Sequence, residues 1–173
     1  MARPDRTPGV TTPRRQDPGP GQESVWDYPR PPRLEPSDRR VEVRVGDRVI
    51  ADTTGAFRVL ETYHPPSWYL PPADIDRSAL EPVGGGSFCE WKGVAVYADV
   101  VTDTGRLPRA AWWYPEPTGS FAAIRDHVAF YPSLVECRVD GELVIPQPGV
   151  FYGGWVTSDV TGPFKGSPGM DGW

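Results

Sequence analysis

The stretch "FCEWKG" at residues 88–93 combines side chains that could do chemistry. Cys89 offers a thiol and Lys92 an amine, and a run of three glycines precedes them. On a straight strand, residues three positions apart point to opposite faces, whereas a turn that enters a strand brings them together. An ammonium group near a thiol favours the nucleophilic thiolate. One hypothesis is therefore a catalytic pair, in which a thiolate or an amine acts on a bound carbonyl or phosphate group.

Packing is the alternative interpretation of this stretch. Cysteine is among the most frequently buried residues and behaves there as a small apolar side chain, and Lys92 would then be an ordinary charge at a strand end. Cys137 differs from Cys89, because it alternates with Val135 and Val139 and is expected in the core. The cysteines and histidines do not have the spacing of a zinc site, so we expect neither a metal nor a cofactor.

Aromatic residues make up 12% of the chain, enough for both a core and a pocket wall. We expect Tyr69, Tyr97 and Trp113 to contact a ligand, together with His127. Alternation places Trp112 and Tyr114 on one face of a strand and Trp113 on the other, so one face is core and the other lines a pocket or lies under the aromatic tail. His127 is a candidate general base, and its alternative is an ordinary residue at the edge of a helix.

Period-two patterns predict a mainly β fold, either a compact twisted sheet, an open barrel or a tent-like sandwich of short antiparallel strands, with one α-helix. "VEVRVGDRVI" and "VECRVDGELV" predict two hairpins, which turn at Gly46-Asp47 and Asp140-Gly141. The two segments match at four of their first five positions, which indicates either an internal repeat or convergence on a good hairpin sequence. The helix is predicted within "TGSFAAIRDHVAFYP", capped by Ser120 and ended by Pro132.

Composition divides the chain into four parts. Proline-rich segments with few apolar residues cannot build a core, whereas the glycine-rich C-terminus keeps enough aromatic residues to lie over the domain. The predicted parts are a disordered basic arm (1–22), an extended proline-rich strap whose Trp26 and Tyr28 tuck against the domain (23–40), a single mainly β domain (41–150) and a packed C-terminal extension (151–173).

Charge and hydropathy limit the partners. The formal net charge of −5 and the isoelectric point near 5.0 argue against nucleic-acid binding. No run of about 18 apolar residues occurs, so we expect no membrane span, and the N-terminus lacks a secretory signal. We therefore expect a cytoplasmic monomer or homodimer.

Six stretches in one order resemble the domain-of-unknown-function 427 family: "VRVGDRVIADT", "LETYHPPSWYLPPADI", "FCEWKGVAVY", "AAWWYPEP", "HVAFYP" and "VDGELV". The resemblance spans about residues 40–145, and "GGWVT…GPFKG" resembles an extension of some members. It implies a compact mainly β domain, found largely in bacteria and labelled nucleotidyltransferase-like. Glu90 and Trp91 stand where members often have proline and tyrosine, and Pro108-Arg109 replaces a glutamate-asparagine pair.

Three functions follow as hypotheses. The first is a small-molecule-binding domain, with or without enzyme activity, whose pocket joins Cys89 and Lys92 to the aromatic wall. The second is a non-catalytic structural or interaction module. The third, implied only by the resemblance, is a nucleotidyltransferase-like activity, which would need paired carboxylates to hold magnesium.

Overall fold

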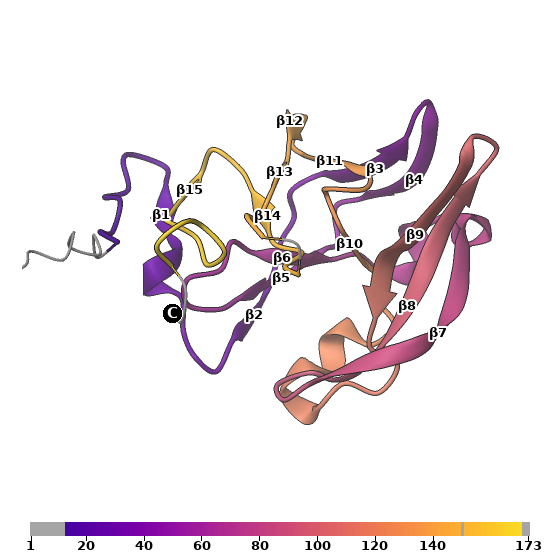
Figure 1. The fold of residues 1–173 in the computed structure, drawn as a ribbon, viewed down its shortest axis with the longest axis horizontal. Helices are drawn as coiled ribbons and strands as arrows, with labels where there is room; N and C mark the ends of the chain where they lie inside the picture. Colours follow the sequence, from indigo (N-terminus) through magenta and orange to yellow (C-terminus); the bar gives the residue numbers. More distant parts are fainter. Residues whose placement is uncertain (1–12, 150, 171–173) are drawn as a thin grey trace, which may run out of the picture.

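The chain folds into several small antiparallel sheets with very little helix, which confirms the mainly β class (Figure 1). The structure, a computed structural model, describes residues 13–149 and 151–170. No helix in these residues is long and apolar enough to cross a membrane. The strands are β1 (Glu23–Ser24), β2 (Arg33–Pro36), β3 (Val41–Val45), β4 (Arg48–Thr53), β5 (Phe57–Leu60), β6 (Ser67–Tyr69), β7 (Leu80–Cys89), β8 (Gly93–Thr102), β9 (Gly105–Trp113), β10 (Ala129–Phe130), β11 (Glu136–Val139), β12 (Glu142–Leu143), β13 (Ile145–Pro146), β14 (Trp155–Val156) and β15 (Val160–Thr161).

The two matching hairpins lie side by side in one sheet, in the order β12-β11-β3-β4. Strand β11 pairs antiparallel with β3, so that Val43 faces Cys137, which is its own counterpart in the sequence match. The hairpins are therefore related by an approximate two-fold axis through this pair. Cys137 is 1% exposed, as the alternation predicts, and burial raises the pKa of its thiol.

The second large sheet has the order β10-β9-β8-β7, and its strands β7 to β9 form a long twisted ribbon at one end of the molecule (Figure 1). Its inner side packs against the hairpin sheet through the main core, where the rings of Trp68 and Trp155 stack 6.0 Å apart. A smaller aromatic cluster, which includes Tyr69, Trp112 and Tyr114, forms a separate core. Strand β9 contributes to both clusters.

The predicted α-helix is wrong. Its segment forms only a 3-10 helix, η4 (Gly119–Ile124), with non-helical dihedral angles at Phe121. Val128 bonds to Leu70 and β10 pairs with β9, so the second half of the segment satisfies its backbone groups in sheets. The apolar spacing misled the prediction because Phe121 and Ile124 also share a face at a period of three. The remaining helical segments are η1 (Val25–Asp27), η2 (Pro72–Asp74) and η3 (Arg77–Ala79), all of the 3-10 type.

The N-terminal segments lie against the domain. Residues 1–12 of the expected arm fall outside the described residues, but Arg15 pairs with Asp27 and Gln16 bonds to the backbone of Gly162. This part of the arm is thus docked rather than a free tail. In the strap, Tyr28 is buried and Trp26 partly buried, as expected.

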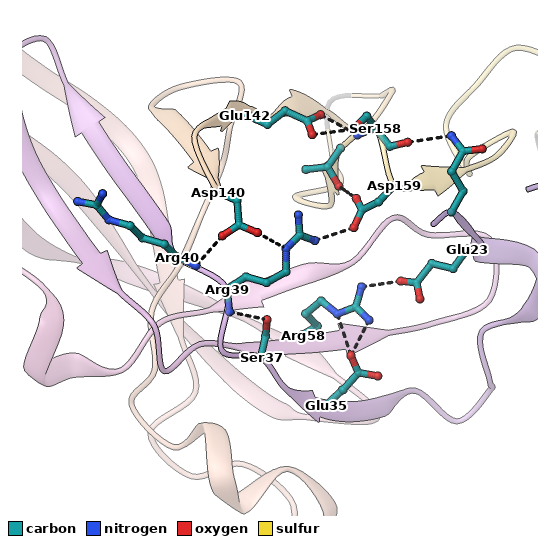
Figure 2. Close-up of polar contacts among 12 residues, drawn as sticks. Glu23, Glu35, Ser37, Arg39, Arg40, Arg58, Asp140, Glu142, Ser158 and Asp159 are labelled. Atoms are coloured by element: carbon teal, nitrogen blue, oxygen red, sulfur yellow. Dashed lines mark hydrogen bonds and ion pairs between the residues drawn. The ribbon is translucent and has the colours of Figure 1, made fainter. Parts of the chain in front are cut away.

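Two arginines join the strap, the domain and the C-terminal extension (Figure 2). Arg58 of β5 reaches Glu23 of β1 and Glu35 of β2, each at 2.5 Å. Its side chain is only 10% exposed. Burial opposes its charge, but the hydrogen bonds to the two glutamates raise the pKa of the guanidinium above its ordinary value.

Arg39 makes the second junction. It binds Asp140 at the hairpin turn at 2.8 Å and Asp159 of the extension at 2.6 Å (Figure 2). Strand β15 also pairs in parallel with β1, so the two ends of the described chain close on each other.

We predict that Gly141→Val lowers the free energy of unfolding by about 1–3 kcal/mol, because Gly141 has a φ of +81°. A Cβ at this position would meet no atom within 4 Å, so the cost comes from the backbone and not from a clash. Gly119→Val is the control, since Gly119 has equal space without a positive φ. Urea unfolding measures both, and equal midpoints would contradict the turn geometry.

We further predict that Arg58→Met lowers the free energy of unfolding by about 2–3 kcal/mol, because charge-assisted hydrogen bonds to two glutamates are lost. Arg33→Met is the matched control. Arg33 bonds the same Glu35 at 3.2 Å, but its side chain is 60% exposed, so about 1 kcal/mol or less is expected. Chemical denaturation measures both variants. Similar losses of unfolding free energy would show that burial of Arg58 adds nothing to the strength of its ion pairs.

Candidate functional site

A cavity of about 400 Å³ opens beside the β7–β8 turn. Its wall contains four of the residues that the sequence singled out, Cys89, Lys92, Tyr69 and Tyr97. The structure adds residues from the β5–β6 loop, strand β9 and the C-terminal extension. The complete wall consists of Val59, Glu61, His64, Pro65, Ser67, Tyr69, Phe88, Cys89, Lys92, Tyr97, Trp112, Tyr114, Tyr131, Gln147, Phe151, Tyr152 and Gly153.

A tight turn brings Cys89 and Lys92 to the same cavity. Cys89 ends β7 and pairs with Gly93 at the start of β8, and the Lys92 N–H donates to the Cys89 carbonyl oxygen at 3.2 Å. Gly93 has a φ of +98°, which lets the chain reverse over three residues. The two side chains are therefore not on opposite faces of a strand, and Cys89 is half-buried.

Lys92 extends its ammonium group over two aromatic rings. Its Nζ lies 5.7 Å from the ring centre of Tyr114 and 6.0 Å from that of Phe121. No carboxylate in the described part of the chain lies within 4.0 Å of this nitrogen. The site thus contains a cation that is held by aromatic rings rather than by a counter-ion.

Strand β9 supplies the aromatic wall, but from the face opposite to the predicted one. Trp112 and Tyr114 line the cavity, whereas Trp113 packs against the main core and borders a separate recess with Leu80 and Val128. The period of two was correct. Alternation alone could not choose between the two faces, because β9 is covered on both sides and apolar residues occur on both.

His127 does not reach the cavity. Its ring packs edge-on against Phe57 at 5.6 Å, and its Nδ1–H donates to the Arg125 carbonyl oxygen at 3.1 Å. The expectation that it contacts a ligand depended on the predicted helix, which would have carried it beside the apolar face. It is instead a half-buried residue in the loop before β10.

A different histidine, His64, lies in the wall. Its Nε2 is 3.3 Å from Glu61, and its Nδ1 accepts from the amide of Gln147 at 3.0 Å. The same amide donates to the Lys165 carbonyl oxygen and accepts from the Gly154 N–H, so its orientation is fixed. Nε2 must then carry the hydrogen that points at Glu61.

Glu61 is the acidic group of the wall, with 23% of its side chain exposed. Burial alone would raise its pKa, but the hydrogen bond with His64 and the charges of nearby groups, Lys92 and Arg30 among them, hold the pKa below its ordinary value. Arg30 approaches to 3.8 Å. The cavity therefore presents one carboxylate and one ammonium that are not paired with each other.

Tyrosine hydroxyls provide most of the remaining polar surface. Tyr69 accepts from Trp112 Nε1 at 3.3 Å, and Tyr97 shares a hydrogen bond with Ser87 at 2.8 Å. Burial raises the pKa values of Tyr69 and Tyr114. Burial and the neighbouring Tyr97 raise the pKa of Tyr131 to about 12. All three are neutral hydrogen-bonding groups at neutral pH.

The C-terminal extension closes the cavity against Trp112. A Cβ on Gly153 would lie 2.3 Å from the indole ring, and one on Gly154 would lie 2.4 Å from Gln147. Only glycine permits this approach. Phe151 and Phe88 also line the cavity and remain largely exposed, at 83% and 75% of their surface.

Several residues of the wall were not predicted from the sequence. Glu61 and His64 stand in "LETYHPPSWYLP", one of the stretches that carries the family resemblance, and that was the available signal. Gln147 and Tyr152 gave none, because only the tertiary fold brings residues 147 and 152 to the β5–β6 loop. Among residues 13–149 and 151–170, no group of three or more His, Cys, Asp or Glu side chains could hold a metal ion.

Residues 33–144 match the model of a family described as a domain of unknown function (DUF427). The matched region covers well over half of the chain and contains most of the cavity wall. Gln147, Phe151, Tyr152 and Gly153 lie beyond it. No curated protein matches the chain.

We predict that a small thiol reagent modifies Cys89 in the folded protein and leaves Cys137 unmodified until unfolding, because Cys89 borders the cavity and Cys137 is buried. Lys92→Ala should slow the modification of Cys89. Mass spectrometry after limited labelling distinguishes the two thiols, with Cys89→Ser as the control. Equal labelling of both cysteines, or of neither, would contradict the assignment.

Proposed function

The chain belongs to the DUF427 family, a domain of unknown function, and we propose that it binds a small organic molecule in the cavity beside Cys89 and Lys92. The observation that carries this proposal is the wall itself. Aromatic rings surround a few polar groups in a space of about 400 Å³. Ligand pockets for small molecules span roughly 300–1,000 Å³ and are lined in this way, so the ligand is small.

The polar groups of the wall support recognition rather than packing. Glu61 is oriented by His64, and His64 is fixed by Gln147. Such support from neighbouring residues pre-organises a binding group and lowers the entropic cost of binding. Cys89 would be the nucleophile of any reaction on the bound molecule, because its thiol borders the same space as the Lys92 ammonium.

A non-catalytic interaction module is the second candidate. This candidate is supported by Phe88 and Phe151, whose rings line the cavity and are largely exposed. Large apolar side chains exposed together often mark a contact surface. In the small-molecule proposal the same two rings form the rim that a bound molecule would partly cover.

We predict that p-cresol, a small neutral aromatic probe, binds the wild-type protein and that Ser67→Phe abolishes binding by filling the cavity that Ser67 lines. Ser120→Phe is the matched control, because Ser120 is exposed on η4, away from the cavity wall. NMR titration of the Trp112 indole N–H measures binding. If Ser67→Phe and Ser120→Phe bind the probe as the wild type does, the cavity is not the binding site.

A further inference from the structure

We infer that the ligand of this cavity is a planar organic anion with a single negative charge, an aromatic or conjugated carboxylate whose carboxylate group meets Lys92. This inference rests on the proposed function and names the class of molecule that it concerns. Four features of the wall support it: an ammonium without a counter-ion, the rarity of lysine in the chain, a second charge of opposite sign, and flat aromatic sides.

The ammonium of Lys92 needs an anion. Its stem is half-buried at the turn, and its Nζ lies over the rings of Tyr114 and Phe121. Aromatic faces attract a cation but do not accept its hydrogen bonds as an oxygen does. A carboxylate that enters the cavity would supply the missing acceptor, and a charge-assisted hydrogen bond in this partly dry setting is stronger than one at the surface.

The use of lysine at this position is unusual for the chain. Eighteen residues are lysine or arginine, and only Lys92 and Lys165 are lysines. The ion pairs that hold the fold, such as those of Arg39 and Arg58, use arginine, whose planar fork binds fixed carboxylates well. A lysine presents a compact charge with rotatable hydrogen-bond donors, which suits a ligand that arrives and leaves.

The second charge in the wall limits the ligand to one negative charge. Among the described residues that line the cavity, Lys92 is the only lysine or arginine, and Glu61 contributes a carboxylate. The low pKa of Glu61 keeps this group ionised at neutral pH. A phosphate dianion would gain one cation and face one anion, whereas a carboxylate placed at Lys92 needs no second cation.

The sides of the cavity favour a flat molecule. The centres of the Trp112 and Tyr131 rings lie 4.5 Å apart, so the two rings are in contact and form one continuous aromatic surface of the cavity. Aromatic groups pack best against other planar groups, in offset or edge-to-face contact. A ring or conjugated chain would pack against this aromatic wall, with its carboxylate directed towards the β7–β8 turn.

The test compares three probes that share the 4-methylphenyl group and differ in their polar group: the monoanion 4-methylbenzoate, its neutral amide 4-methylbenzamide, and the dianion 4-methylphenyl phosphate. Affinities are measured by NMR titration of the full chain at pH 7.5 and low salt. We expect the benzoate to bind about tenfold or more tightly than the amide. The phosphate should bind more weakly than the benzoate, and Glu61→Gln should narrow that difference.

Variants of the two lysines assign the effect. Lys92→Met keeps the stem that packs near Tyr114 and removes the charge, so the preference for benzoate over the amide should disappear. Lys165→Met should retain it, because Lys165 lies over Tyr152 and does not line the cavity. Lys92→Arg preserves a cation and should keep part of the preference for benzoate. It therefore shows whether a loss of that preference in Lys92→Met comes from the missing charge or from misfolding.

The test distinguishes failure of the inference about charge from failure of the proposed binding function. If benzoate and amide bind the wild type equally and Ser67→Phe still blocks both, the inference about charge is overturned while the proposed binding function stands. If the acid preference survives in Lys92→Met, the anion binds elsewhere and the inference is also overturned. If Ser67→Phe blocks no probe, the proposed function itself fails.

Discussion

Burial of one charge, the Arg58 guanidinium, holds the periphery of this molecule to its centre. Arg58 lies on β5 and binds carboxylates from β1 and β2, so three short strands meet at one cation. Such strands are not stable alone. Because β1 also pairs with β15, the same junction secures the C-terminal extension.

The cavity depends on that arrangement. Strand β5 leads directly to Glu61 and His64, and the residues after the β11–β12 hairpin bring Gln147 and Gly153 to the same cavity. The aromatic core of the family domain thus forms one side of the cavity, and a segment outside the family match forms the other. The extension is therefore part of the cavity wall through Tyr152 and Gly153, and part of the main core through Trp155.

The family match and the cavity bear on function in different ways. The match identifies the domain and leaves its activity open, while the wall has a chemistry of its own: one thiol, one ammonium, one oriented carboxylate and several neutral tyrosines. Lys92 and Glu61 line the same cavity, and no ion pair of the described chain joins them, because Glu61 is paired with His64 and Arg30 instead. A partly buried ammonium without a carboxylate partner is costly, and an anionic ligand would offset that cost.

The sequence by itself determined the elements whose partners are near in the chain. Alternating residues and a two-residue turn predict the β3–β4 and β11–β12 hairpins, because a strand has a period of two and an Asp-Gly turn needs little else. The same local logic identified Cys89 and Lys92 and the burial of Cys137. Only the tertiary structure decided the rest: β9 is buried on both faces, so alternation could not tell Trp112 from Trp113. The segment after Ser120 does not form the predicted α-helix, because its second half pairs with β9 and satisfies its backbone groups there. His64 and Gln147 are 83 residues apart, and no local pattern predicts a hydrogen bond that only folding creates.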